Sequence, residues 1–503
     1  MSRLFTKNRL LIILGVLLHT LALAYGLFYI AWICLVPLFI AIQQKKGKKA
    51  FYAGAYYGFV FGCLALFWLP FTVLSLTQGT VAKAFFAGLL AFTVYTIFYG
   101  LLIWAFSILR GDKNHVFKNA LLVSAIWTIA DFLLSSISNG MPWFSMCIGN
   151  TLLGNLYAIQ PAEYGGIALL GFVVVLINYL IAQYFLLKQW KKMLIPGGLV
   201  VAYIITGYFI LSNFYKRWKP SEPPVTIALL NGNISHTEQW NKENGNILVK
   251  RLLSLNEEAL STHPDIVLWT ESVVPWYYKA NDDFLNVVLK NSDSAYQIIG
   301  MNTGIAHNEL YNSAYCFSSN GNVIGRYDKR YLISMAEQPM SFLGQSILKN
   351  EEDAYFEPGE GNRVLATSKG KIGVLICNEV FVAGAARGAV EEGAEFLVSL
   401  ASDALVAIAP SVVNQQFFRS RLRAVEVRKD IAISCNKGIS GIIAASGEIL
   451  DSERSDEGFI QNIDVNPNSF KVKHQFIKIG IVYFSIFTIA FFSFLNLLKT
   501  KKP

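Results

Sequence analysis

Charged residues are scarce in this chain: only 15% of its 503 residues are Asp, Glu, Lys or Arg, whereas 53% are hydrophobic. A typical soluble domain carries about 25% charged residues, so this composition argues against a soluble enzyme and predicts a membrane protein. The chain also has only six cysteines and six histidines. Because the cysteines form no CxxC pair and no Cys–His metal spacing, we expect neither a disulfide framework nor a metal site, and we expect no cofactor.

Long apolar runs fill the first part of the chain and recur at its end. We expect eight membrane spans, at about 10–25, 27–43, 52–75, 83–109, 119–135, 165–187, 194–213 and 477–497. Most of these runs approach the ~20 apolar residues that a helix needs to cross a bilayer. The run at 119–135 contains Asp131, which is costly in lipid and is therefore expected to face protein or water.

The positions of lysine and arginine predict the orientation. Positive charge occurs near the N-terminus, in every second connection and in the tail; these residues are Arg3, Lys7, Arg9, 44–49, Arg110, Lys113, Lys118, Lys188, Lys191, Lys192 and 499–502. The alternate loops near 76–82 and 136–164 contain neither residue type. Positive loops stay in the cytoplasm, so both termini are expected there. The long segment 214–476 is then expected on the outer face of the membrane.

Composition changes at residue 214 and indicates a second domain. The polar, proline-containing segment 214–224 is typical of a linker. Short β-branched runs then alternate with helical patterns, which predicts an α/β domain of its own. We therefore expect seven spans in a membrane domain at 1–213, a catalytic domain at 225–470, and an eighth span with a cytoplasmic tail at 471–503.

Three predicted strands of this domain end in reactive residues. "DIVLWTES" leads to Glu271, "NVIGRYDK" to Lys329 and "KIGVLICNE" to Cys377. Ligands of open α/β sheets bind beyond strand ends, so the three residues can meet at one site. A carboxylate can take the thiol proton, a thiolate can attack an acyl group, and an ammonium can stabilise both thiolate and oxyanion. The trio is therefore sufficient for acyl transfer without a histidine.

The same residues carry a resemblance to a known family. "LWTES", "YDKRYL" and "GVLICNE" resemble the Glu–Lys–Cys motifs of the nitrilase (carbon–nitrogen hydrolase) superfamily, whose domain is an α-β-β-α sandwich. With the surrounding spans, and with "GMPWFS" (140–145) and "QPAEYGGIALLGF" (160–172), the chain resembles the apolipoprotein N-acyltransferase family.

This resemblance implies an activity and its partners. The thiol of Cys377 attacks a phospholipid ester, Glu271 accepts the thiol proton and Lys329 stabilises the charged intermediate. The acyl chain then passes from the cysteine thioester to the N-terminal amine of a diacylglyceryl-cysteine apolipoprotein. The partners implied are a phospholipid donor, a diacylated apolipoprotein acceptor and the bilayer, with no nucleic acid.

Further residues follow from the resemblance alone. Glu337 and Glu379 match two supporting acids, and Trp240 and Asn378 match substrate-binding positions. The apolar stretches 334–344, 379–386 and 401–410 are interpreted either as lid arms that dip toward lipid or as ordinary core packing. The chain departs from the family pattern around the expected pocket, at Ser334, Met335, Ala336, Asn378, Leu405 and Val406. These departures concern substrate preference, or another amine acceptor, more than the chemistry.

The residues alone do not exclude two other functions. The same trio supports a membrane-anchored amidase or nitrilase in which water replaces the amine, although one span would suffice for anchoring. A transporter or lipid-binding protein with a degenerate enzyme domain is the other alternative. The intact trio and the few charges in the spans argue against it.

Overall fold

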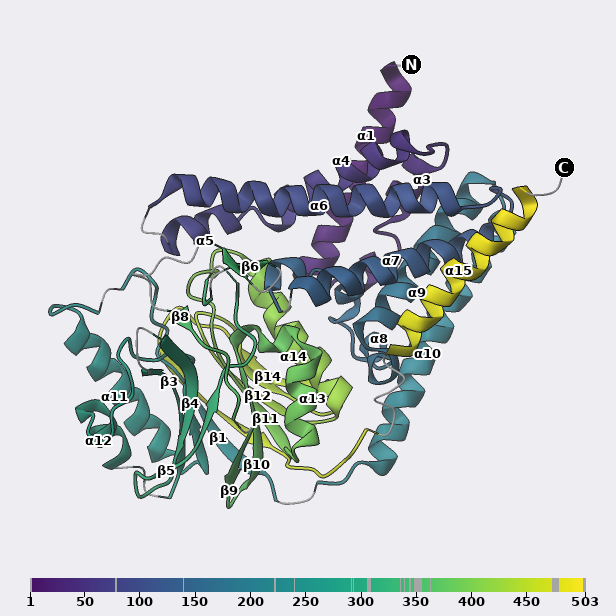
Figure 1. Ribbon diagram of the computed structural model, residues 1–503. Helices are drawn as coiled ribbons and strands as arrows, with labels where there is room; N and C mark the ends of the chain where they lie inside the picture. The colour runs from purple at the N-terminus through teal and green to yellow at the C-terminus, as the bar shows by residue number, and fades with distance from the viewer. Residues whose placement is uncertain are drawn as a thin grey trace.

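A helical part and an α/β part pack against each other in the computed structural model (Figure 1). The structure describes residues 2–76, 79–138, 140–220, 223–238, 240–290, 292, 294–304, 309–334, 336–338, 340–342, 345–347, 355–361, 363–472 and 479–500. The helical part begins at the N-terminus and regains one helix at the C-terminus, and both termini lie at the same end of it (Figure 1).

The helical part consists of eleven described α-helices. They are α1 (Ser2–Tyr25), α2 (Phe28–Ala31), α3 (Val36–Ile42), α4 (Lys48–Ala65), α5 (Leu69–Leu76), α6 (Val81–Leu109), α7 (Val116–Ser138), α8 (Leu156–Ile159), α9 (Ala162–Leu186), α10 (Leu194–Arg217) and α15 (Gly480–Thr500). Short 3-10 helices lie between them, at η1 (Pro142–Phe144), η2 (Ile148–Leu152) and η3 (Trp190–Met193).

Five of the helical segments are long and apolar enough to cross a membrane. They are Lys7–Tyr25, Val81–Leu109, Val116–Ser138, Ala162–Leu186 and Trp190–Arg217. The pair Lys48–Ala65 and Leu69–Ser75, bent by 48°, makes a sixth if it is one span. The expected spans at 27–43 and 477–497 contain shorter apolar helices, Phe28–Ile42 and Gly480–Leu495. The described residues thus support five or six spans, and eight remain a prediction.

Glycines allow a very close contact between the helices α4 and α6. A Cβ at Gly54 would lie 2.3 Å from the Tyr99 carbonyl oxygen, and one at Gly58 would lie 2.1 Å from that of Tyr95. Both distances are far shorter than van der Waals contact, so only glycine fits at these positions. Small residues let helix backbones approach closely where lipid supplies no hydrophobic driving force between helices.

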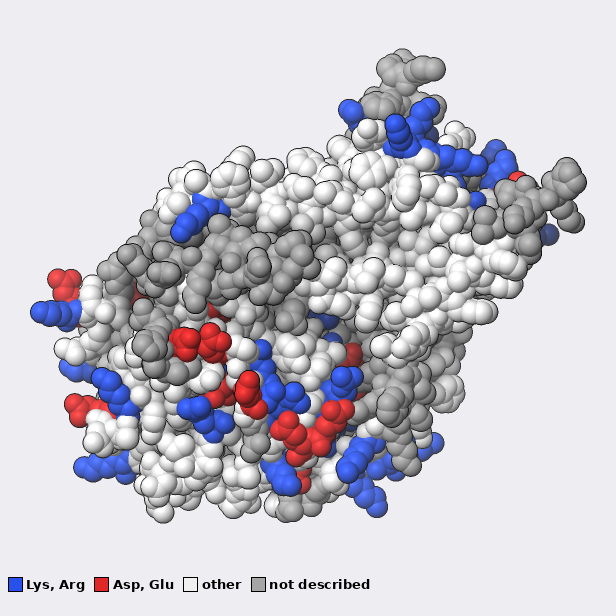
Figure 2. Space-filling model, in the orientation of Figure 1, with Lys and Arg blue, Asp and Glu red and all other residues white. Residues whose placement is uncertain are grey.

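The outer surface of the helical part matches a lipid environment. Figure 2 shows the region of α6, α7 and α15 as nearly uncharged, with Lys and Arg gathered at the end where both termini lie. The α/β part carries acidic and basic side chains intermixed (Figure 2). Asp131 on α7, expected to avoid lipid, accepts a hydrogen bond of 3.1 Å from the backbone of Ile148 in η2.

The α/β part contains two main sheets that pack face to face. One has the order β15-β1-β2-β3-β4-β5, with β8 beside β4, and the other has the order β14-β13-β12-β11-β10-β9. The strands of the first sheet are β1 (Val225–Asn231), β2 (Ile266–Leu268), β3 (Tyr296–Gly304), β4 (Glu309–Phe317), β5 (Val323–Asp328), β8 (Tyr355–Phe356) and β15 (Phe459–Val465). Those of the second are β9 (Val364–Thr367), β10 (Gly370–Ile376), β11 (Phe396–Ser402), β12 (Ile431–Asn436), β13 (Ser440–Ile443) and β14 (Ile449–Glu453). A small hairpin of β6 (Met340–Phe342) and β7 (Gln345–Ile347) stands apart.

Helices cover the outer face of each sheet. The first sheet packs against α11 (Gly245–Ser261) and α12 (Asp283–Lys290), and the second against α13 (Ala383–Glu391) and α14 (Pro410–Val427). A third apolar cluster lies between the sheets and includes Ile227, Leu268, Val374 and Val398. This is the α-β-β-α layering that the family resemblance implied, and the expected hairpin between β4 and β5 forms through antiparallel pairing.

α14 joins the two parts of the molecule, as its position beneath the membrane helices in Figure 1 shows. Its Arg419 donates to the carbonyl of Ser145, and its Arg421 donates to that of Leu153 at 3.0 Å. Just beyond the helix, Arg428 forms a buried ion pair of 2.6 Å with Glu163 at the start of α9. These contacts explain why a helix rich in arginine is buried along most of its length.

Candidate active site

The carboxyl ends of several strands lie together and carry the three expected residues. Glu271 comes three residues after β2, Lys329 directly after β5 and Cys377 directly after β10. β2 runs parallel to β1 and β3, and β10 runs parallel to β11. The two sheets are linked at this edge by Asn231, whose amide donates 2.7 Å to the carbonyl of Cys435.

Cys377 begins a tight turn at the end of a buried strand. It is the first residue of the 3-10 helix η4 (Cys377–Phe381) and has a φ of 53°, in the left-handed region. That conformation is unfavourable for a residue with a side chain, and such strain concentrates at functional sites. Cys377 is partly exposed, whereas Cys316 in β4 and Cys435 in β12 are buried. The turn therefore presents this thiol at the strand exit.

Lys329 is a buried cation held by two carboxylates. Its side chain is 1% exposed, and its Nζ lies 2.7 Å from Oε1 of Glu337 and 3.5 Å from Oε1 of Glu271. Burial alone would lower the pKa of Lys329, but Glu337, Glu271 and Cys377 together raise it above its ordinary value. The ammonium thus stays charged at neutral pH, as stabilisation of an anionic intermediate requires.

Asn312, on β4, orients both carboxylates. Its Nδ2 donates 2.8 Å to Oε1 of Glu271 and makes a longer contact of 3.4 Å with Oε1 of Glu337. Its backbone carbonyl also accepts the amide hydrogen of Lys329 at 2.8 Å. Sequence reasoning missed Asn312 because an amide inside a predicted strand gives no pattern of its own.

The thiol of Cys377 is neutral in the resting site. Burial raises its pKa well above the ordinary value, and Glu271 raises it further, while Lys329 lowers it. The net direction is upward, so this cysteine is not a preformed thiolate. A base must therefore remove the thiol proton during reaction, and Glu271 is the carboxylate with the largest electrostatic effect on it.

Glu379 connects the cysteine turn with the lysine loop. Its side chain is fully buried and accepts hydrogen bonds from the Tyr327 hydroxyl at 2.7 Å and from the backbone of Arg330 at 2.9 Å and Ile376 at 2.8 Å. Burial raises the pKa of Glu379, and these hydrogen bonds oppose that shift. The contacts hold the strand end before Cys377 against the loop after Lys329.

The two expected substrate-binding residues have structural contacts. Asn378 is buried, and its Nδ2 donates 3.0 Å to the carbonyl of Tyr331 and 3.3 Å to that of Gly140 in the helical part. Its Oδ1 has no hydrogen-bond partner within the described residues. The ring of Trp240 packs edge-to-face on Trp276 at 5.7 Å. Substrate contact by either residue stays a prediction.

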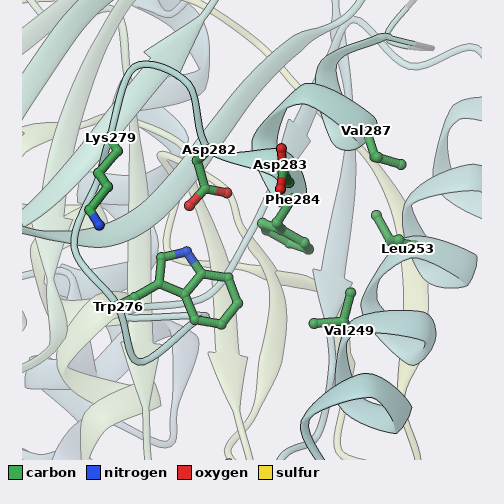
Figure 3. Close-up of a pocket in the computed structure, with 8 residues that line it drawn as sticks. All are labelled: Val249, Leu253, Trp276, Lys279, Asp282, Asp283, Phe284 and Val287. Carbon is green, nitrogen blue, oxygen red and sulfur yellow. The ribbon is translucent and has the colours of Figure 1, made fainter.

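Trp276 forms one wall of a surface groove of about 520 Å³ between α11 and α12. Figure 3 shows its indole below Lys279 and Asp282, opposite the aliphatic side chains of Val249 and Leu253. Trp240 therefore packs on the back of a groove wall.

The departures from the family pattern lie in loops around the site. Ser334 and Ala336 belong to the segment after Lys329 that holds Glu337, and Met335 lies outside the described residues. Leu405 and Val406 follow β11, and the carbonyl of Leu405 accepts 3.0 Å from the Thr72 hydroxyl on α5.

The three stretches interpreted as lid arms or core packing differ in outcome. Residues 379–386 are core: Val380, Phe381, Ala385 and Ala386 are buried against the second sheet and α14. The lid-arm interpretation is wrong there, because η4 turns this segment inward. The stretch 401–410 ends in a partly exposed turn with Ile408 57% exposed, and the stretch 334–344 lies partly outside the described residues.

Comparison with known proteins identifies the family. Residues 14–180 match the family model described as the apolipoprotein N-acyltransferase N-terminal domain, and residues 226–466 match that of carbon-nitrogen hydrolase. The chain belongs to the apolipoprotein N-acyltransferase family. It is a bacterial membrane protein with a nitrilase-like domain.

Curated apolipoprotein N-acyltransferases resemble the chain along most of its length. The protein from Geobacter metallireducens is 28% identical over 451 residues, covering 86% of this chain and 84% of its own. The protein from Vibrio vulnificus is 24% identical over 481 residues, covering 90% and 89%. Among solved structures, a carbon–nitrogen hydrolase from Helicobacter pylori aligns with 54% of this chain and 94% of its own, at 18% identity and a TM-score of 0.37.

Proposed function

We propose that this protein moves an acyl chain from a phospholipid, through a thioester on Cys377, to the N-terminal amine of a diacylglyceryl-cysteine lipoprotein. The observation that carries the proposal is the placement of Lys329 between Glu271 and Glu337, electrostatically coupled to the strand-end thiol. The two family models, which join a membrane part to a hydrolase-type domain, supply the substrate class.

The first half-reaction forms the acyl-enzyme. Glu271 takes the proton of the Cys377 thiol as the sulfur attacks the ester carbonyl of the phospholipid. Lys329 has three N–H donors, of which two meet Glu337 and Glu271. The third is available to the oxyanion of the tetrahedral intermediate. Glu271 then gives its proton to the departing lysophospholipid oxygen, which leaves a thioester.

The second half-reaction releases the product. The acceptor amine attacks the thioester carbonyl, and Lys329 again stabilises the oxyanion. Glu271 takes a proton from the attacking nitrogen and returns it to the departing sulfur, so an amide forms and the thiol is restored. Glu337, Glu379 and Asn312 act by positioning these groups.

The location of the site fits substrates that stay in the bilayer. Removing a buried methylene from lipid costs about 0.8 kcal/mol, so a two- or three-chain lipid reacts most cheaply at the membrane surface. The Thr72–Leu405 hydrogen bond sets a loop of the catalytic domain against α5. We propose eight spans, with both termini in the cytoplasm and residues 225–470 on the periplasmic side of the inner membrane.

Product analysis tests this function. The full chain in detergent–phospholipid micelles is given a synthetic peptide with N-terminal S-diacylglyceryl-cysteine, and mass spectrometry follows N-acylation. We expect N-acylated peptide from the wild type and from Cys316→Ala, a control that removes a buried thiol of β4, and none from Cys377→Ala. Hydrolysis of small amides without peptide acylation would instead indicate a membrane-anchored amidase.

A further inference from the structure

A further buried ionisable group, Asp403, lies at the same edge of the sheets as the proposed catalytic residues. Asp403 directly follows β11, which pairs in parallel with β10 on one side and β12 on the other. Its backbone amide donates 2.8 Å to the carbonyl of Asn436, and its residue surface is 2% exposed. The residue is therefore fixed beside the strand exit that carries Cys377.

The side chain of Asp403 has a neutral hydrogen-bond partner, the Cys435 thiol, but no cationic partner among the described residues. Its Oδ2 accepts no hydrogen bond, and no Lys or Arg nitrogen lies within 4 Å of it, in the part of the chain that is described. The Cys435 thiol interacts with the carboxylate. A Cβ at Gly438 would come within 2.5 Å of Oδ2. Burying a carboxylate without full pairing is costly, which points to a role in the reaction.

The ionisable groups that interact electrostatically with Asp403 come from four elements. They are Glu271 after β2, Cys377 after β10, Cys435 on β12 and Arg454 after β14. Burial raises the pKa of Asp403 to about 7 and Glu271 contributes in the same direction, while Cys435 and Arg454 oppose the shift. At neutral pH the group can therefore both hold and release a proton.

The proposed reaction has a place for such a group, because Glu271 alone does not carry all of its protons. The acceptor enters as an ammonium, since a free α-amino group has a pKa of about 7.7–8.0. Ammonium and thioester become amide, thiol and one free proton. Glu271 carries one proton from nitrogen to sulfur. The other proton must leave before the nitrogen can attack, and it goes either to a second base in the site or to solvent water.

We propose that Asp403 is this second base: its carboxylate binds the α-ammonium of the acceptor and takes one proton from it before the nitrogen attacks the Cys377 thioester. The N–H bond breaks, an O–H bond forms on Asp403, and the proton later passes to water. This inference rests on the proposed function, because it assigns the acceptor side of the same site. A general base is most effective when its pKa is close to the working pH.

The test separates the two half-reactions in the full chain. Asp403→Asn is compared with wild type and with Asp456→Asn, which changes an exposed acid of the loop before β15. Acylation of Cys377 by a phospholipid with a labelled acyl chain is followed first. Transfer from the isolated acyl-enzyme to the S-diacylglyceryl-cysteine peptide is then timed between pH 6 and pH 9. Acylation also reports whether the variant is folded.

We expect Asp403→Asn to acylate within about threefold of wild type but to transfer about 10-fold more slowly at pH 7, because roughly a tenth of an amine with a pKa of about 7.7–8.0 is already neutral at that pH. The difference in transfer rate between Asp403→Asn and the wild type should become smaller toward pH 9, where the peptide amine is neutral without a base in the site. Transfer at the wild-type rate would overturn the inference, and so would equal losses in both steps at every pH, which indicate a structural role. Absence of acyl-enzyme in the wild type would instead contradict the proposed function.

Discussion

Nζ of Lys329 lies 2.7 Å from Oε1 of Glu337, closer than the 3.5 Å that separates it from Glu271. Glu337 is therefore the main anchor of the lysine, which leaves Glu271 available for proton transfer. A hydrogen bond to a charged group contributes about 1.5–3 kcal/mol, and this amount sets the scale of the first prediction.

Replacing Glu337 with Gln should slow the enzyme without unfolding it. The amide oxygen can still accept from Lys329, but the negative charge is lost and the ammonium shifts its pairing toward Glu271. We expect kcat/KM for peptide acylation to fall roughly 10- to 100-fold. Steady-state kinetics measure this loss, with the exposed Glu391 of α13 changed to Gln as control. Wild-type kinetics in Glu337→Gln would contradict the anchoring role.

The reactivity of the Cys377 thiol should depend on pH in a specified direction. Burial and Glu271 raise its pKa, so the thiolate fraction is low at pH 7 and increases as the pH rises toward that raised pKa. Removing the Glu271 charge in Glu271→Gln should lower the pKa and shift alkylation to lower pH. Removing the cation in Lys329→Met should shift it upward, because Lys329 lowers the pKa.

Iodoacetamide labelling between pH 6 and pH 10, with Cys377→Ala as the blank, measures these shifts. The two variants must move the labelling curve in opposite directions. Movement in the same direction would show that the charges do not act on the sulfur in the way described.

Replacing Glu379 should lower the stability of the protein more than removing the hydroxyl group of its partner Tyr327. Glu379→Gln places amide hydrogens among the donors from Tyr327, Arg330 and Ile376, and at least one donor loses its partner. An unsatisfied buried polar group costs about 1–3 kcal/mol. Tyr327→Phe removes one donor and should cost about 1 kcal/mol. Thermal unfolding in detergent compares the stabilities of Glu379→Gln and Tyr327→Phe. A larger loss of stability in Tyr327→Phe would contradict this account.

The buried ion pair between Arg428 and Glu163 should hold the catalytic part on the membrane part. Both side chains are at most 2% exposed. Glu163→Gln leaves a buried guanidinium without its counter-charge, which costs roughly 3–5 kcal/mol. The exposed pair Arg387–Glu391, at 3.7 Å, supplies the control, since Glu391→Gln should change stability by about 0.5 kcal/mol or less. Equal Tm values for the two variants would show that this ion pair does not hold the catalytic part on the membrane part.

Sequence patterns predicted the strands best where apolar residues fill both faces. β2 and β10 each start within one residue of the runs that lead to Glu271 and Cys377. The patterns missed β14 because its last three residues, Asp451 to Glu453, are polar and exposed. They also missed β15, whose alternating burial is visible in its sequence.

Hydropathy described the membrane part less well because it cannot detect breaks in a helix. The run 27–43 is uniformly apolar, yet it divides into α2 and α3 around a turn at 32–35, with Pro37 in the first turn of α3. The run 52–75 bends by 48° between α4 and α5. Each break is followed by a proline in the first turn of the next helix, Pro37 in α3 and Pro70 in α5, and a proline interrupts a helix without lowering the hydropathy of the run.

The candidate site was predictable in part. Strand exits identified Glu271, Lys329 and Cys377, whereas Glu337 and Glu379 came only from the family resemblance. Asn312 and Asp403 were not proposed as site residues, because their roles depend on which strands are neighbours across the two sheets. The positive φ of Cys377 likewise has no signal in sequence, since the residue is not glycine.

The most direct measurement is the intact mass of the purified full chain after incubation with a phospholipid of defined acyl chains and no acceptor. The account predicts a mass increase of one acyl group, located on Cys377 by peptide mapping, removed by neutral hydroxylamine and present in Cys316→Ala. An unmodified Cys377 under conditions where the protein N-acylates the peptide would contradict the thioester route.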